Sequence, residues 1–153
     1  MEIRFCLAWL GSGVLSSKSF KQDGARALFG DYVERISKFV PCQISGAVQF
    51  EARKSGIKTW VCDRSAGAKE LSSEELAKAL ENLMGSGVRG FQLVIGGPDG
   101  FSKGELEELK PDFRWSFGPM TLPHELAAVV ASEQIYRAFT IIRKMPYHSG
   151  HSA

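Results

Sequence analysis

A glycine-rich turn, IGGPDG at residues 95–100, follows the most hydrophobic predicted strand and is the first candidate for ligand binding. Gly96 and Gly97 lack Cβ atoms, so the backbone there can approach a ligand closely, while Pro98 stiffens the turn. The turn could hold a nucleotide. It is neither a GxGxxG fingerprint nor a phosphate-binding loop ending in Lys-Ser/Thr, so a glycine-rich turn without any ligand is an equal alternative.

Side chains able to exchange a proton near neutral pH lie towards the C-terminus. His124 belongs to TLPHELAAVVASEQIYRAF, residues 121–139, and Tyr147 and His148 follow Pro146. An imidazole can act as acid or base near pH 7, but a histidine at a helix start can also be only solvated or capping. His148 and His151 have no Cys or carboxylate beside them, so we expect no metal site.

The composition predicts one ordinary globular domain. The chain has 153 residues, 44% of them hydrophobic and 24% charged, with a net charge of +2 that permits an anionic partner without requiring one. Cys6, Cys42 and Cys62 are odd in number and have no CxxC spacing, which favours buried reduced thiols. No segment approaches the roughly 20 apolar residues of a membrane span, so we expect a cytoplasmic protein without membrane contact.

Strands and helices alternate along the chain. The patterns predict strands at 3–10, 42–45, 57–62, 90–95 and about 114–117, and helices at 18–39, 72–84, 102–109 and about 123–143. Residues 46–56 could extend a strand but favour a short helix, because a parallel crossover needs about ten residues. Ser72 or Ser73 is the expected cap of the helix at 72–84 and Thr121 that of the last helix, which Pro146 ends. This order predicts an α/β fold with a parallel sheet covered on both faces, and ligands then bind beyond the carboxyl ends of the strands.

Three segments together, LVIGGPDGFS, WSFGPMTLPHELAAVVASEQIYRAF and the closing PYH, resemble the ribosomal RNA large subunit methyltransferase H family. These are small members of the SPOUT class of S-adenosylmethionine-dependent methyltransferases, and the resemblance is specific over residues 91–148. It implies one domain, 1–148, whose parallel sheet carries a C-terminal trefoil knot, followed by a disordered tail at 149–153. It also implies a homodimer joined through the long C-terminal helix, whose apolar stripe comprises Leu126, Val129, Val130 and Ile141.

The resemblance further implies methylation at N3 of a pseudouridine in 23S ribosomal RNA, within the large subunit or the assembled ribosome. By matching position, S-adenosylmethionine would contact Cys62, Gly96, Gly118, Pro119, Met120, Thr121, Leu122 and Pro123. The reaction would involve His148, Tyr147, Arg137 and His124. Either histidine could take the N3 proton, the tyrosine could orient the nucleobase, and the arginine could bind phosphate or favour the nucleobase anion.

Two positions depart from the family pattern. Many members carry a basic residue where this chain has Ala128, and another where it has Ser149. The alternative to an enzyme is therefore a catalytically impaired ribosome- or RNA-binding module of the same fold. A nucleotide-dependent oxidoreductase would need a dinucleotide fingerprint after the first strand, where WLGSGVLSS offers only GxG.

Overall fold

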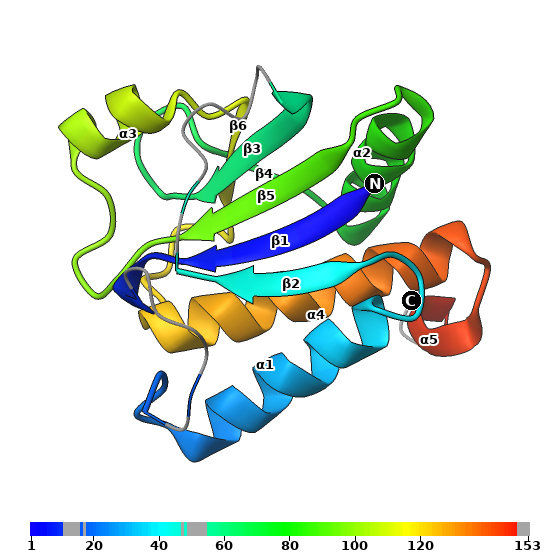
Figure 1. Ribbon diagram of the computed structural model, residues 1–153, viewed down its shortest axis with the longest axis horizontal. Coiled ribbons are helices and arrows are strands. Elements are labelled where there is room, and N and C mark those ends of the chain that lie inside the picture. Colours follow the sequence, from blue (N-terminus) through cyan, green and yellow to red (C-terminus); the bar gives the residue numbers. More distant parts are fainter. Residues whose placement is uncertain (11–15, 17, 47, 49–54, 150–153) are drawn as a thin grey trace.

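The computed structural model of the protein describes residues 1–10, 16, 18–46, 48 and 55–149 and shows a parallel sheet flanked by helices (Figure 1). The described strands form one six-stranded sheet in the order β2-β1-β5-β3-β6-β4, with every pair parallel. Their bounds are β1 Glu2–Leu7, β2 Cys42–Ser45, β3 Ile57–Cys62, β4 Lys69–Glu70, β5 Gly90–Ile95 and β6 Phe113–Ser116. This confirms the predicted fold class.

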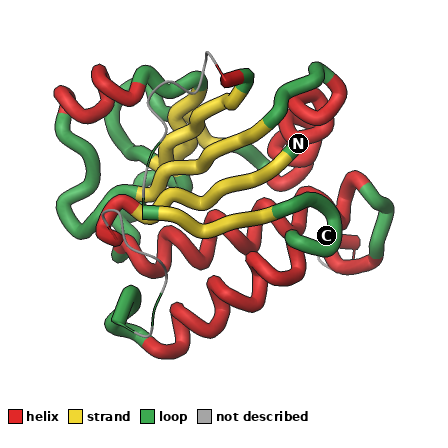
Figure 2. Tube along the Cα trace, viewed as in Figure 1, coloured by secondary structure: helices red, strands yellow, loops and turns green. Residues whose placement is uncertain are grey.

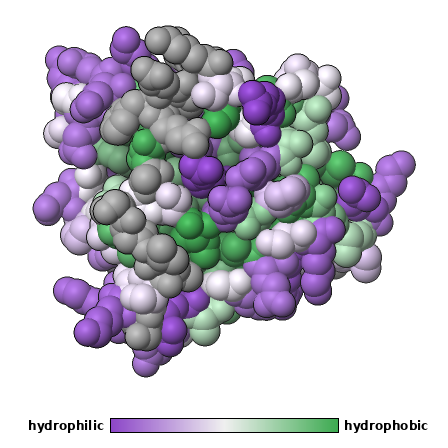
Figure 3. Space-filling view, viewed as in Figure 1, coloured by the Kyte–Doolittle hydropathy of each residue, from purple (hydrophilic) through white to green (hydrophobic). Residues whose placement is uncertain are grey.

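The helices lie on both faces of the sheet, as Figure 2 shows. They are α1 Asp23–Ile36, α2 Ser73–Gly85, α3 Lys103–Leu109, α4 His124–Ile142 and the short α5 Pro146–Ser149, with a 3-10 turn η1 at Ala8–Leu10. None of these helices is long and apolar enough to cross a membrane. In the space-filling view, hydrophilic side chains project around the periphery and apolar ones gather mainly between them (Figure 3).

Strand alternation divides the interior into two cores of unequal size. Ile3, Phe5 and Leu7 of β1 face the larger core, which α1, α2 and α4 cover. Cys6 and its neighbours on β3 and β5 face a smaller core completed by Phe101 and α3. Every residue of β5 is buried because this central strand has a neighbour on each side and cover on both faces.

Two helices begin as their sequences predict. The Ser72 hydroxyl accepts the Glu75 N–H at 3.1 Å, and the Glu75 carboxylate accepts the Ser72 N–H at 2.8 Å, which makes a capping box at the start of α2. Ser102 and Glu105 form the same pair at the start of α3. Free N–H groups of the first turn are therefore satisfied locally, and both starting points could be located in the sequence.

Other element ends differ from the predictions, and for α1 the cause is a contact with a distant part of the chain. The strand predicted at 3–10 ends at Leu7, where η1 follows, and the short β4 was not predicted. The helix predicted to begin at 18 begins at Asp23, because the Glu125 carboxylate binds the preceding backbone. The helix predicted at 46–56 falls mostly outside the described residues.

α4 matches the helix predicted at about 123–143 within one residue at each end, but its cap and its stop signal differ from the predictions. Thr121 does not cap it: Pro123 is the N-cap residue and provides no side-chain hydrogen bond. The helix ends at Ile142, before Pro146, and the backbone turns at Lys144 with a φ of 57°. Of the tail at 149–153, only the backbone of Ser149 is described, and it completes α5. The trefoil knot stays a prediction, because strand order does not establish how the chain is threaded.

Candidate active site

A cavity of about 380 Å³ opens at the carboxyl ends of the parallel strands. Its walls come from three loops, at residues 62–65 after β3, 95–101 after β5 and 115–122 from β6 onward, together with the start of α4. Small-molecule sites commonly measure about 300–1,000 Å³. The cavity therefore has the position expected for a ligand site in an open α/β sheet and enough volume for one.

The glycine-rich turn folds back on itself at one wall of this cavity. Gly97 and Gly100 form an antiparallel bridge, and the Gly100 N–H donates to the Gly97 carbonyl at 2.9 Å. A Cβ atom on Gly96 would lie 3.1 Å from the Phe101 ring and 3.3 Å from the backbone of Gly100. Gly96 is thus needed for the turn to close against Phe101, in addition to forming part of the cavity wall.

Most of the residues predicted to contact the cofactor meet in this cavity. The following six line it: Cys62, Gly96, Gly118, Met120, Thr121 and Leu122. Pro119 and Pro123 do not line it, although the Pro119 carbonyl accepts a hydrogen bond from the Arg64 guanidinium at 3.4 Å. Residues 62 and 96 come from neighbouring strands β3 and β5, whereas the others come from the loop before α4, so distant segments converge on one wall.

Cys62 forms an apolar part of the wall. Burial, with the nearby Asp63 carboxylate adding to it, raises the pKa of its thiol far above the usual range. A thiol that stays protonated is a poor nucleophile. Cys62 therefore shapes the cavity and does not supply reactive sulfur.

A polar rim around Asp63 was missed among the predicted site residues. Its carboxylate accepts the backbone N–H groups of Arg64 at 2.8 Å and Ser65 at 3.2 Å, and it also accepts the Ser65 hydroxyl. Arg114 of β6 donates to that hydroxyl at 2.9 Å and lies 3.7 Å from Asp63. The only signal in the sequence is an acid directly after a strand. Arg114 comes from a separate strand, so the contact required the fold.

His124, the first residue of α4, also lines the cavity. Its ring meets Trp9 edge-on with 4.6 Å between ring centroids, and its Nε2 is 3.7 Å from the Glu125 carboxylate. Glu125 is buried and accepts the N–H groups of Lys21 and Gln22, each at 2.9 Å. Trp9 and Glu125 were not predicted as site residues, and together they link the cavity wall to the segment before α1.

The other three predicted catalytic residues lie at the far end of α4. Arg137 is 13 positions after His124, which corresponds to about 20 Å along a helix axis. Tyr147 and His148 belong to α5, which sits beyond the C-terminal end of α4 and away from the carboxyl ends of the strands (Figure 1). A single protomer therefore does not bring these three side chains to the cavity.

These three residues form a hydrogen-bonded cluster of their own. Arg137 donates to the Glu133 carboxylate at 2.7 and 2.9 Å and lies 3.0 Å from His148 Nδ1. The Tyr147 hydroxyl donates to the same carboxylate at 3.1 Å. Burial raises the pKa of Tyr147 well above its usual value, and hydrogen bonds to Tyr32 and Glu133 add to the effect. This hydroxyl is therefore a donor at neutral pH.

The cluster also reaches the first turn of α2. His148 Nε2 lies 2.7 Å from the Glu74 carboxylate, and this hydrogen bond is the largest cause that lowers the pKa of Glu74 below its usual value. Ser73 donates to Gln134 of α4 at 2.7 Å, which adds a second link between the two helices. Within the described residues, no group of three or more His, Cys, Asp or Glu side chains is placed to hold a metal ion.

Comparison with known proteins gives consistent similarities. A family profile described as "Predicted SPOUT methyltransferase" matches residues 13–148. A ribosomal RNA large subunit methyltransferase H of Xylella fastidiosa (strain 9a5c) is 48% identical over 140 residues, covering 80% of this chain and 87% of that protein. The protein of the same name from Koribacter versatilis is 34% identical over 157 residues, covering 99% and 100%.

A solved structure is also similar, at a lower level. It is described as a methyltransferase of Legionella pneumophila with the bound cofactor SAM, and it aligns with a TM-score of 0.43 and 16% sequence identity. The alignment covers 91% of this chain and 66% of that chain. This similarity is too low to carry any conclusion about the cavity.

Proposed function

The chain belongs to the ribosomal RNA large subunit methyltransferase H family of SPOUT methyltransferases, and on this premise we propose that it transfers a methyl group from S-adenosylmethionine to large-subunit ribosomal RNA. The target is N3 of a pseudouridine, within the large subunit or the assembled ribosome, and the reaction takes place in the cytoplasm. The observation that carries the proposal is the cavity in which the glycine turn and the loop before α4 meet.

The cavity residues fit S-adenosylmethionine. Apolar walls at Ile95, Trp115 and Phe117 suit an adenine ring, while Asp63 and Asp99 provide negative charge for hydroxyl groups and a cationic sulfur. The cofactor supplies an electrophilic methyl group when bound. The chain itself must align the acceptor nitrogen, exclude water and allow the N3 proton to leave. His124 supplies an imidazole in the cavity wall that could accept that proton or hold the nucleobase in place.

We propose that Arg137, Tyr147 and His148 take part in the reaction at the cavity of a second protomer in a homodimer. A two-fold contact that packs α4 against α4 of a second protomer would set the tail of one protomer beside the cavity of its partner. Leu126 is 44% exposed on α4, and Met120 beside the cavity is 71% exposed, which supports an apolar contact there. Val129 of the predicted stripe is buried within the protomer and belongs to its core.

The residues that depart from the family pattern bear on the RNA-binding alternative. Ala128 is fully buried in the protomer, so this position presents no surface for phosphate in this chain. Arg64 is exposed at the cavity rim and could supply such a contact from another loop. The cavity favours an enzyme over an impaired module, because a module without catalysis would have no need of a cofactor site.

Two measurements test the proposal together. Titration calorimetry with S-adenosylmethionine should show saturable binding, whereas an impaired RNA-binding module should show none. Incubation with methyl-labelled cofactor and ribosomes that lack the modification should transfer label to large-subunit RNA. Binding of cofactor without any transfer to ribosomes or isolated subunits would refute the proposed substrate.

A further inference from the structure

His148 is held between a group that can only donate and a group that can only accept. Arg137 Nη1 lies 3.0 Å from Nδ1, and the Glu74 carboxylate lies 2.7 Å from Nε2. A guanidinium has no acceptor and an ionised carboxylate has no donor. In the neutral ring, Nδ1 must therefore accept and Nε2 must carry the hydrogen.

The surrounding charges reinforce this orientation. Glu74 of α2 and Arg137 of α4 contact His148 directly. Glu133 of α4 binds Arg137 and the Tyr147 hydroxyl, which also hydrogen-bonds to Tyr32. Glu133 binds Arg137 through two of its nitrogens, which fixes the plane of the guanidinium that meets Nδ1. Of the two contacts to the ring, the one from Arg137 comes from the neighbouring α4, whereas the one from Glu74 comes from α2, far away in sequence.

We propose that Glu74 is a positioning residue for His148, fixing the Nε2–H tautomer and the direction of the ring together with Arg137. This inference rests on the proposed function, in which the tail takes part in methyl transfer. While both contacts are kept, the neutral ring has no free lone pair. His148 then holds the nucleobase in position, and removal of the N3 proton falls to another group.

Exposure separates this role from a purely structural one. The Glu74 side chain is 66% exposed, and exposed ion pairs contribute little to stability. Loss of the carboxylate should leave the fold and the cavity of the same protomer intact, while the imidazole ring becomes free to rotate and to change tautomer. Misplacement of a reacting or aligning group by about 1 Å can slow a reaction by as much as a hundredfold. We therefore expect a rate effect without a change in cofactor affinity.

The test combines ring spectroscopy with kinetics on the full chain. Two-bond ¹H–¹⁵N correlation spectra of ¹⁵N-labelled protein at about pH 8, above the usual titration range of imidazoles, report the tautomer of each histidine. A His148→Gln variant assigns the signals. The matched control is Glu81→Ala, which removes an exposed glutamate of the same helix whose ion pair, with Lys78 at 3.9 Å, stays within that helix.

The expected results are an Nε2–H tautomer in the wild type, mixed tautomers in Glu74→Ala, and methyl transfer slowed at least about tenfold in that variant. S-adenosylmethionine affinity should not change. Glu74→Gln keeps an acceptor oxygen and should stay close to the wild type, as should Glu81→Ala. An Nδ1–H tautomer in the wild type, a wild-type rate in Glu74→Ala, or a loss of cofactor affinity in it would overturn the inference. If the wild type transferred no methyl group, the proposed function would fail. The spectra would still decide whether Glu74 fixes the tautomer of the His148 ring.

Discussion

Replacement of Glu125 tests the link between the start of α1 and the cavity wall. The buried carboxylate accepts the N–H groups of Lys21 and Gln22, each at 2.9 Å. Gln22 is the N-cap residue of α1 and makes no side-chain capping bond. Glu125 therefore supplies from α4 the acceptor for the N-cap N–H that a glutamate at the third helical position supplies in a capping box.

Glu125→Ala should lower the free energy of unfolding by about 2–4 kcal/mol. A hydrogen bond to a charged group contributes about 1.5–3 kcal/mol, and two are lost here, although water can replace part of this loss because Lys21 and Gln22 are exposed residues. For a chain of this length, each kcal/mol corresponds to about 2–4 °C in melting temperature. We expect a decrease of roughly 10 °C.

The effect should depend on pH in a defined direction. Burial disfavours the charge of Glu125, but the N–H groups of Lys21 and Gln22, helped by His124, outweigh it and hold the pKa of the carboxyl below its usual value. A carboxyl with a depressed folded pKa stabilises the fold above the unfolded value of about 4.3 and loses this contribution as pH falls through the folded value. The stability gap between wild type and Glu125→Gln should be constant near pH 7 and shrink below about pH 4.

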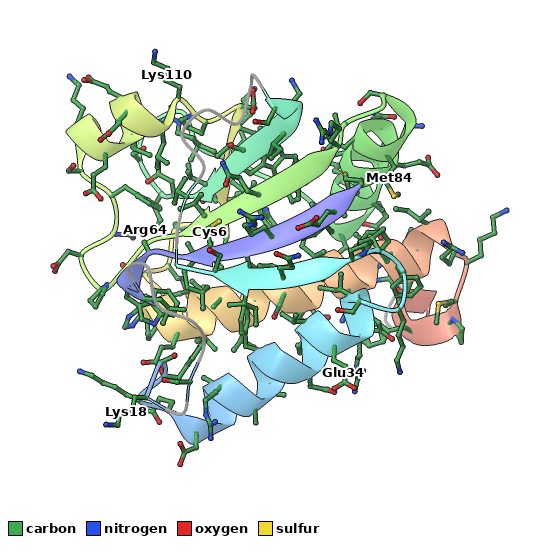
Figure 4. All side chains as sticks on the ribbon, in the orientation of Figure 1. Cys6, Lys18, Glu34, Arg64, Met84 and Lys110 are labelled. Carbon is green, nitrogen blue, oxygen red and sulfur yellow. The ribbon has the colours of Figure 1, made fainter. Side chains whose placement is uncertain are left out.

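Urea unfolding at one fixed protein concentration measures both effects, because a dimer would make stability depend on concentration. Glu34→Ala is the control, since Glu34 is an exposed glutamate on α1 (Figure 4). If Glu125→Ala were as stable as Glu34→Ala, the carboxylate could not be the acceptor that starts α1.

Three further predictions concern the cavity and the tail. Gly96→Val should abolish S-adenosylmethionine binding in calorimetry, because its side chain would collide with Phe101 and the backbone of Gly100, and unchanged affinity would reject the role of this turn. His148→Ala should slow single-turnover methylation of ribosomes by about a hundredfold with cofactor affinity nearly unchanged, because an aligning group is lost, and a near-normal rate would remove His148 from the reaction. Cys62 should react slowly with thiol reagents at neutral pH, because burial raises the pKa of its thiol, and rapid labelling at this position would show that the thiol ionises readily.

The sequence predicted those parts of the fold that depend on neighbouring residues. The capping pair Ser72 and Glu75 set the start of α2, and the uninterrupted apolar run of β5 marked the central strand. The start of α1 could not be predicted, because the acceptor that fixes it, Glu125, follows about a hundred residues later in the chain. The two residues of β4 are too few for any periodic pattern to detect.

For the candidate site, the resemblance to known motifs identified much of the cavity wall but not its arrangement. Residues 62, 96, 118 and 120–122 meet because parallel strands end at one edge, which an alternating pattern of strands and helices predicts. The separation of His148 from His124 depends on the length and direction of α4 in the folded protein. The contacts of Asp63 with Arg114 and of His148 with Glu74 join segments far apart in sequence, and neither spacing nor composition marks them.

The most direct test of the central claim is mass mapping of ribosomal RNA after reaction. Ribosomes that lack the modification would be incubated with the purified protein and methyl-labelled S-adenosylmethionine, and the large-subunit RNA would be digested and analysed by mass spectrometry. The proposed function predicts one added methyl group on a pseudouridine, at N3, with no such product from Gly96→Val. Methylation confined to another nucleoside, or its absence from large-subunit RNA despite saturable cofactor binding, would contradict it.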